Sequence, residues 1–388
     1  MSVAPASILS YYPNYALLDE ILAYKNYKKI NLFIDLKNCL QSLYMEHAVL
    51  SIVESSIRAR FIDTSIFSSV VTFLSFHKIY SLKRNIDINT YIFFETGDSH
   101  FHKNIDPMYK TTRRNDNLFG LDREKRDKFT EIVQKNLMMV EKMCHKMPKT
   151  KVIRMSNIDA DFVPYYLNRN KLIPMDSDTV NVTYSADHDM LQNVQNDCHV
   201  YQKHYKYKKI VCKNQVMSNF LKFDSNLPDE YLPLAMALDG DAGDDIPGIK
   251  GIGKGTIAKI IEDIVQMVGG MDLLNQNVFN NKPIFINPSL SPNKYIDKIL
   301  EVEASDKRVS KNLKMSSYEL LSMYMDDPPN TEMVKKKDYL LNQINSNEII
   351  PYKPMLESLS MVGVMFDNDA LENIYHITQT ATDSYNVE

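Results

Sequence analysis

The sequence of 388 residues contains only four cysteines, and no two of them form a C-x-x-C pair. This scarcity excludes the common structural zinc motifs and favours a reduced, cytosolic setting. No apolar run is long enough to span a bilayer, and the N-terminal stretch lacks the basic and then apolar plan of a signal peptide. We therefore expect a cytoplasmic protein without a membrane partner.

The chain also lacks an excess of basic residues. Its 45 Lys and Arg against 49 Asp and Glu give a net charge of −4, which argues against a protein that coats DNA nonspecifically. With 44% hydrophobic and 24% charged residues, the composition is that of a folded globular protein. The length predicts two or three domains, and there is no internal repeat.

Buried runs of β-branched and aromatic residues predict four strands, at 28–40, 89–95, 150–155 and 179–186. Helix-like segments stand between them, for example at 51–80. Strands that alternate with helices predict an α/β fold with a mainly parallel sheet. After Phe220 the chain reads as mainly helical, and the Asn- and Pro-rich stretch 271–297 reads as an irregular insertion.

Acidic residues follow the predicted strands. In open α/β sheets the carboxyl ends of the strands form the ligand crevice, so acids distant in sequence converge there. The acids that we expect to share this crevice are Asp35, Glu95, Asp159, Asp161, Asp187 and Asp189. Two more, Asp241 and Asp244, are three residues apart, a spacing that places both on one face of a helical turn.

So many carboxylates in one pocket would raise each other's pKa values unless cations neutralise them. Hard oxygen ligands favour Mg²⁺ or Mn²⁺, and two such ions roughly 4 Å apart suit the hydrolysis of phosphodiesters. The alternative is that each acidic pair only caps a helix or shapes a turn; Asp159, for example, could cap a helix that begins near Phe162.

The stretch "PGIKGIGKGTIAKII" places Gly251 and Gly253 in a turn between two short helices. Glycines allow a tight turn, and the amides at the start of the next helix suit a phosphate. Lys254 and Lys259 would add positive charge. A dinucleotide-binding fold needs a strand directly before the glycines, where "GDDIPG" stands instead. A purely structural hairpin with solvated lysines is the other alternative.

These motifs resemble those of the 5′-nuclease superfamily, which includes flap endonucleases, bacterial 5′–3′ exonuclease domains and phage RNase H-type nucleases. The resemblance covers residues 28–262. "FIDLKN", "DADF", "TYSADHDMLQNV" and "GDAGDDIPGIKGIGKGTIA" are each similar to a family motif, and the last is the most specific. In "FFETGDSHFHKNIDPMYKTTR" the residues that keep the family register are Phe101, Tyr109, Lys110 and Arg113.

The resemblance implies a PIN-like nuclease domain over 25–220 with an arch at 103–150. A helix–three-turn–helix DNA-binding region and a divergent helical C-terminal part would occupy 221–388. It implies two Mg²⁺ ions, with Mn²⁺ as a substitute, and K⁺ at the glycine turn. Asp35, Glu95, Asp159 and Asp161 would serve the first metal site; Asp187, Asp189, Asp241 and Asp244 would complete the second.

The resemblance also assigns roles outside the metal sites. Lys110 and Arg113 would contact the scissile phosphate. Tyr109 would stack on an unpaired base, unless it is an ordinary packed tyrosine. The glycine turn would bind the duplex backbone.

Three positions depart from the family pattern. Glu95 occupies the position of a family aspartate, and Asp98 is a conceivable substitute for that ligand. Phe162 occupies the position of a second family acid, and His102 that of a family arginine.

The leading hypothesis is a structure-specific 5′-nuclease of replication or repair. The alternatives are a DNA-binding replication factor that has lost catalysis and a PIN-type ribonuclease. We expect a monomer whose partners are junction DNA, RNA–DNA hybrid and replication proteins. The abundance of Lys, Asn, Ile and Tyr is typical of an AT-rich genome, such as that of a phage in its bacterial host.

Overall fold

The fold is that of a computed structural model, which describes most of the chain between residues 15 and 345. The described ranges are 15–35, 84–96, 100–111, 149–156, 158–185, 187–204, 207–285, 293–327 and 331–345, with His77, Tyr80, Ser81, Glu124, Met138, Glu141, Cys144 and His145. The expected helix at 51–80 and most of the expected arch at 103–150 lie outside these ranges. Within them, no helix combines the length and the apolar character needed to cross a membrane.

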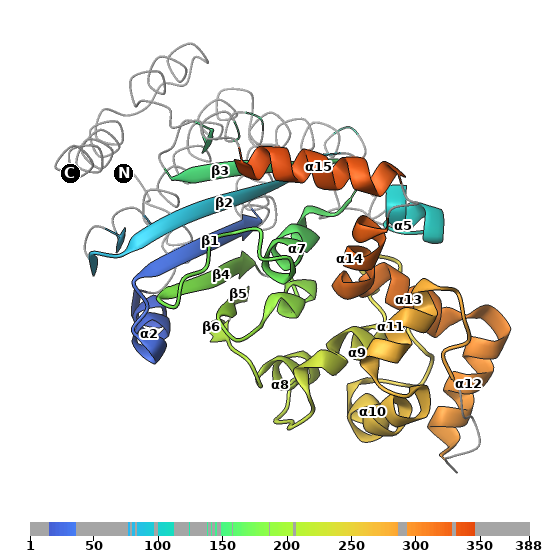
Figure 1. The fold of residues 1–388 in the computed structure, drawn as a ribbon. Coiled ribbons are helices and arrows are strands. Elements are labelled where there is room, and N and C mark those ends of the chain that lie inside the picture. The colour runs from blue at the N-terminus through green and yellow to red at the C-terminus, as the bar shows by residue number, and fades with distance from the viewer. Residues whose placement is uncertain are drawn as a thin grey trace.

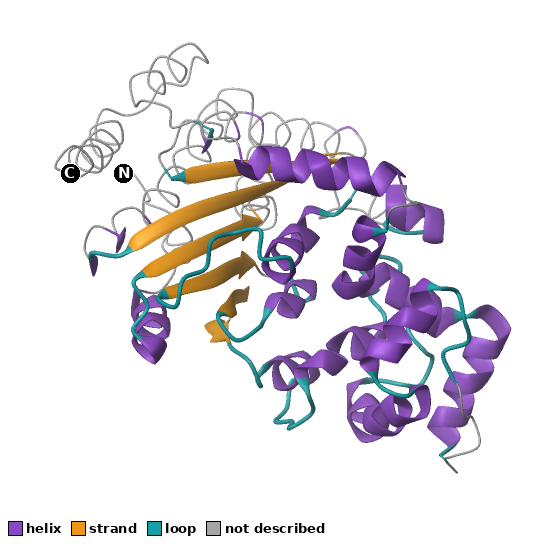
Figure 2. Cartoon of the chain, viewed as in Figure 1, coloured by secondary structure: helices purple, strands orange, loops and turns teal. Residues whose placement is uncertain are grey.

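A six-stranded sheet forms one side of the molecule, in the order β3-β2-β1-β4-β5-β6 (Figures 1 and 2). Its strands are β1 (Lys29–Asp35), β2 (Asp87–Thr96), β3 (Thr150–Ser156), β4 (Thr179–Ser185), β5 (Cys198–His204) and β6 (Tyr207–Val211). The first five pair in parallel and only β6 is antiparallel, to β5. The mainly parallel α/β sheet predicted from the sequence is therefore confirmed.

The central strands are apolar because both faces of the sheet are covered. Phe33 on β1 is fully buried and stacks on Tyr91 and Phe93 of β2, with ring centroids 5.2 and 5.9 Å apart. The register pairs Asp35 with Phe93, so the last residue of β1 lies beside β2 at the carboxyl edge of the sheet. Since parallel strands share that edge, the end of β1 and the described segments that follow β3 and β4 meet there.

Helices make up most of the rest of the described chain. They are α2 (Tyr15–Lys25), α5 (His100–Ile105), α7 (Val163–Arg169), α8 (Val216–Leu221), α9 (Leu232–Asp239), α10 (Lys254–Val268), α11 (Met271–Phe279), α12 (Lys294–Asp306), α13 (Arg308–Ser316), α14 (Tyr318–Asp326) and α15 (Thr331–Asn345). Short 3₁₀ turns are η3 (Ala160–Phe162), η4 (Asp189–Asn193) and η5 (Asp229–Tyr231). The mainly helical character after Phe220 is confirmed.

The irregular insertion expected at 271–297 is wrong at both of its ends. Helix α11 occupies its first part, and α12 begins at Lys294. Met271, Leu274 and Val278 are buried at helical spacing, so packing of this apolar face outweighs the weak helix propensity of the intervening asparagines.

The two larger apolar clusters among the described residues form most of the core. One joins β5 and β6 to helices α8 to α13. The other combines Phe33, Phe93 and Phe162 with Tyr318 and Leu340 from the C-terminal helices. Figure 1 shows α15 lying along β3, and the two elements are in contact. The division into domains at residue 220 stays a prediction. A second domain that begins there would include α15, which packs against the sheet of the first.

Candidate active site

The predicted acids lie in segments that the sheet brings to one edge. Asp35 is the last residue of β1. Asp159 and Asp161 flank the start of η3, which follows β3. Asp187 and Asp189 follow β4, and Asp189 is the first residue of η4. The Asp187 carboxylate accepts a hydrogen bond from the amide of Asp189 at 3.2 Å, which fixes their relative orientation.

The electrostatics show that these side chains converge. Burial raises the pKa of Asp161 well above its usual value, and the charges of Asp159, Asp187 and Asp35 raise it further against the opposing effect of Lys110. The pKa of Asp189 is likewise raised by burial and then by the charges of Asp187, Asp161, Asp241 and Asp244. Four separate stretches of the chain therefore contribute carboxylates to one neighbourhood.

Asp159 is the best-supported member of the cluster. Its Oδ2 accepts a hydrogen bond from the Tyr109 hydroxyl at 2.6 Å and lies 3.2 Å from Nδ1 of His102, and its Oδ1 accepts one from Nζ of Lys110 at 3.1 Å. Burial raises the pKa of Asp159, but His102, Lys110 and Tyr109 together outweigh burial and hold this pKa well below its usual value. Asp159 is therefore ionised whereas Asp161 is driven towards protonation.

The placement of Tyr109 corrects the expectation that its ring stacks on an unpaired base. Only 3% of the residue is exposed, and its hydroxyl also lies 3.2 Å from Oδ2 of Asp244. A hydroxyl has one proton, so the shorter contact to Asp159 is the stronger hydrogen bond. Asp159, in turn, precedes η3 without capping it through its side chain, so the capping alternative is wrong for this residue.

Asp241 and Asp244 belong to a tight turn after α9. The helical turn that we expected for them is wrong. Asp241 and Ile246 exchange backbone hydrogen bonds of 2.8 Å, and the Asp241 carboxylate accepts from the amide of Gly243 at 2.7 Å. A Cβ on Gly240 would lie 2.2 Å from the backbone nitrogen of Gly248, so this close approach requires glycine. The amide of Lys110 donates to the Asp244 carbonyl at 3.1 Å, which ties the two segments together.

Within the ranges that the structure describes, no three His, Cys, Asp or Glu side chains are spaced to hold one metal ion. Carboxylates of like charge repel each other when no cation lies between them, and Lys110 draws Asp159 and Asp244 to itself, with Nζ 3.7 Å from Asp244. Among the residues that the structure describes, Oδ1 of Asp161 is buried and has no hydrogen-bond partner. An unsatisfied carboxylate oxygen among other carboxylates fits a hard divalent cation.

Three expected site residues lie wholly or partly outside the described part of the chain. Arg113 and Asp98 lie outside the described residues, and Glu95 is described only as a backbone position of β2, opposite Met155. Phe162 is fully buried against Tyr166 and Tyr318, so the residue that stands in place of a family acid is part of the core.

The glycine turn follows the acidic turn directly. Gly251 has a φ of +81°, and Gly253 precedes α10, which is 15 residues long rather than short. Nζ of Lys254 donates to the Phe220 carbonyl at 2.8 Å and lies 4.2 Å from the centre of the Phe220 ring. Lys254 is thus partly committed to the protein itself, whereas Lys259 is exposed.

Sequence reasoning missed Tyr318 and Gln192. Burial raises the pKa of the Tyr318 hydroxyl well above its usual value, and the charges of Asp161, Asp189 and Asp187 raise it further, which places this C-terminal residue beside the acids. Gln192 donates to the Ser316 carbonyl at 2.8 Å and accepts from the Tyr318 amide at 3.0 Å. No local sequence pattern predicts that either residue belongs to the site, because only tertiary packing brings α14 to the sheet edge.

No family model matches the sequence, and a search of curated proteins found no match. Among solved structures, a flap endonuclease of bacteriophage T5, in a pseudo-enzyme–product complex with DNA and metal ions, has a TM-score of 0.54 and 16% identity, over 86% of this chain and 99% of that chain. The 5′-exonuclease of bacteriophage T5 with bound divalent zinc ions has a TM-score of 0.53 and 16% identity, over 85% of this chain and 98% of that chain.

The molecule thus has the fold of the 5′-nucleases, as the sequence motifs predicted. At these identities the likeness concerns the fold, and function has to be argued from the site.

Proposed function

We propose that this chain is a divalent-metal-dependent 5′-nuclease that hydrolyses phosphodiesters of DNA near single-strand/double-strand junctions. The observation that carries the proposal is the convergence of carboxylates from β1, η3, η4 and the turn after α9 around Lys110. The phage structures of the same fold, described with metal ions in both cases and with DNA in one, support it. Removal of flaps or RNA primers in replication or repair is the role that such an activity would serve.

The acids Asp35, Asp159, Asp161, Asp187, Asp189, Asp241 and Asp244 would hold the ions, with Glu95 as an eighth. Bound Mg²⁺, or Mn²⁺ in its place, supplies an activated water and stabilises the charge that develops on the leaving oxygen. His102 and Tyr109 keep Asp159 ionised and oriented. The Lys110 ammonium, now paired with Asp159, is positioned to face a phosphate once cations neutralise the carboxylates. Arg113 would be a second phosphate contact.

The turn at Gly251 and Gly253 would bind the duplex backbone, with K⁺ held by main-chain carbonyls. Lys259 and Lys254 would add positive charge. The glycine turn adjoins the acidic turn, so a duplex bound at the first would present its strand to the second.

The test is cleavage of a 5′-labelled flap and of an RNA-primed duplex, each with Mg²⁺ and with EDTA. We expect products only with Mg²⁺. Asp161→Asn and Asp187→Asn should abolish cleavage and leave DNA binding nearly intact. The matched control is Asp272→Asn, on the exposed first turn of α11, which should cut normally. Unchanged turnover in both site variants would refute the metal assignment.

One observation favours a second candidate, a DNA-binding replication factor without catalysis. Phe162 fills the core where a family acid would stand, so one ligand is lost. Such a protein binds forked DNA but releases no product with any divalent ion. Measurable cutting would eliminate it.

A further inference from the structure

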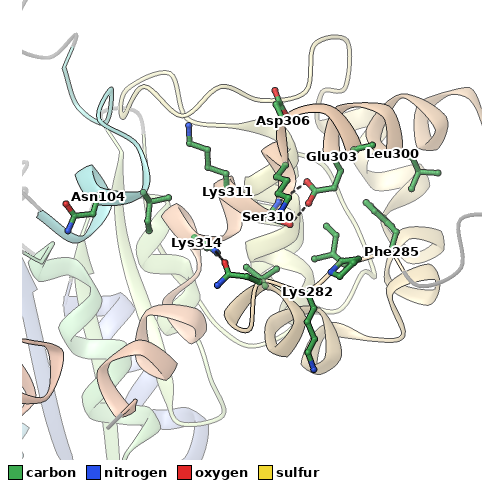
Figure 3. Close-up of a pocket in the computed structure, with 16 residues that line it drawn as sticks. Asn104, Lys282, Phe285, Leu300, Glu303, Asp306, Ser310, Lys311 and Lys314 are labelled. Carbon is green, nitrogen blue, oxygen red and sulfur yellow. Dashed lines mark hydrogen bonds between the residues drawn. The ribbon is translucent and has the colours of Figure 1, made fainter. Parts of the chain in front are cut away.

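A cavity of about 920 Å³ lies between α5, α12, α13 and the segment that follows α11 (Figure 3). None of the acids of the candidate active site lines it. Its walls combine two kinds of surface. Ile284, Phe285 and Leu300 provide apolar surface, and Lys282, Lys307, Lys311 and Lys314 provide positive charge. This volume lies in the range of ligand-binding sites.

The four lysines outnumber the two acids in the wall, so the lining carries net positive charge, and both acids already have partners within the protein. Glu303 accepts hydrogen bonds from the amide and the hydroxyl of Ser310, which Figure 3 marks. Asp306 pairs with Arg308 at 2.6 Å. The amides at the start of α13 are engaged in these same contacts, so the lysines remain as the groups that can hold an anion.

The lysines differ in whether they already form ion pairs within the protein. Lys311 pairs with Asp106 at 2.7 Å. Lys314 donates to the neutral side chain of Asn281 at 2.5 Å, and neither Lys314 nor Lys307 makes an ion pair with any residue that the structure describes. Burial lowers the pKa of Lys314, and the nearby charge of Lys307 lowers it further. Two like charges beside an apolar wall favour an anionic occupant.

The cavity opens on a different side of α12 from the glycine turn. A Cβ on Gly251 would lie 3.4 Å from Nζ of Lys298, so Lys298 reaches that turn. Leu300 and Ala304, which line the cavity, are two and six residues beyond Lys298, and a helix of 3.6 residues per turn places them on the far side. Duplex DNA at the glycine turn would therefore not enter the cavity.

We propose that this cavity is a docking site for an acidic peptide segment of a partner protein, with its carboxylates on Lys307 and Lys314 and an apolar side chain against Leu300 and Phe285. The apolar part of the wall is aliphatic except for a single aromatic ring, that of Phe285, so it lacks the stacked platforms that single-stranded nucleic acid uses. Positive charge around an apolar floor complements a segment that alternates acidic and apolar residues.

The experiment measures fluorescence anisotropy of a labelled peptide in which a run of aspartates precedes leucine and phenylalanine. We expect salt-sensitive binding that weakens about tenfold in the double variant Lys307→Glu/Lys314→Glu. Lys298→Glu, on the opposite side of α12, is the matched control and should bind the peptide normally. Replacing the leucine and phenylalanine of the peptide by serine should also weaken binding. Thermal melting checks that each variant folds, and Lys307→Gln serves if the double variant does not.

Three outcomes overturn the proposal: no binding up to the highest soluble protein concentration, equal losses in the double variant and in Lys298→Glu, or retention of affinity by the serine peptide. A single-stranded oligonucleotide that displaces the peptide and loses affinity in the same double variant would make the cavity a nucleic-acid site instead. None of these readouts depends on nuclease activity, so the site and the proposed function can fail separately.

Discussion

At the scale of single residues, the site is organised around one buried carboxylate. Asp159 keeps its charge because a tyrosine, a lysine and a histidine contact it. Asp161, two residues away, has a buried oxygen that no described residue hydrogen-bonds. Strongly shifted pKa values among buried acids of one cluster are typical of functional sites. Tyr109 departs most from its expected role, because its hydroxyl makes hydrogen bonds within the protein.

Replacing Tyr109 by phenylalanine tests that contribution. The ring volume is kept and one buried hydrogen bond to a charged acceptor is lost, so we expect the free energy of unfolding to fall by about 1.5 kcal/mol. Urea titration measures the loss. Tyr91→Phe is the control, because Tyr91 is also buried but has no hydrogen bond from its hydroxyl to a described residue. Equal losses in the two variants would show that the Tyr109 hydroxyl contributes nothing specific.

At the scale of elements, α13 fixes the turn after α9 that carries Asp241 and Asp244. Asn312, of which 1% is exposed, donates from Nδ2 to the carbonyls of Ala237 and Pro247, each at 2.8 Å. These carbonyls lie on either side of Asp241 and Asp244. A single amide from the C-terminal half therefore closes the loop that carries two of the acids.

We expect Asn312→Ala to lower the free energy of unfolding by about 2–3 kcal/mol, because two buried carbonyls lose their donor. Asn280→Ala is the matched control: the Asn280 amide also donates to a carbonyl, that of Gln276 at 2.7 Å, but on the exposed end of α11. It should cost less than about 0.5 kcal/mol. Denaturant titration of both variants checks the difference, and similar costs would contradict the bracing role of Asn312.

Packing of α14 against α7 and α15 should depend on pH through Asp326, the last residue of α14. Its carboxylate accepts hydrogen bonds from Tyr166 at 2.8 Å and from Lys337 at 2.7 Å. Burial raises the pKa of Asp326, but these bonds and the charge of Arg169 outweigh burial and hold it below its usual 3.8. Because the pKa is depressed on folding, the stabilisation is complete above pH 3.8 and is lost as the pH falls through the lower folded value.

Asp326→Asn should therefore lower the free energy of unfolding by about 1 kcal/mol at neutral pH. The difference from the wild type should shrink as the pH falls below 3.8. Chemical denaturation at a series of pH values measures it. A difference that stays constant down to strongly acidic pH would mean that the ionised carboxylate is not the source of the effect.

At the scale of the whole molecule, the parallel sheet and the order of the acids could be predicted because both follow from local patterns. Buried runs predicted β1 to β4, and each of these strands has an acid at its carboxyl end or shortly after it. The β5–β6 hairpin was missed since its lysines, such as Lys208 and Lys209, made it read as a basic surface stretch. Tyr318 and Asn312 could not be found from the sequence, because their roles arise only when the C-terminal helices return to the sheet.

The central claim is that carboxylates from four stretches of the chain form one site for divalent cations. Isothermal titration with Mn²⁺ tests it without relying on catalysis. We predict that the wild type and Asp272→Asn bind the ion alike, and that Asp161→Asn and Asp187→Asn each bind it at least about tenfold more weakly, since each loses an anionic oxygen ligand. Wild-type affinity in both Asp161→Asn and Asp187→Asn would contradict the account.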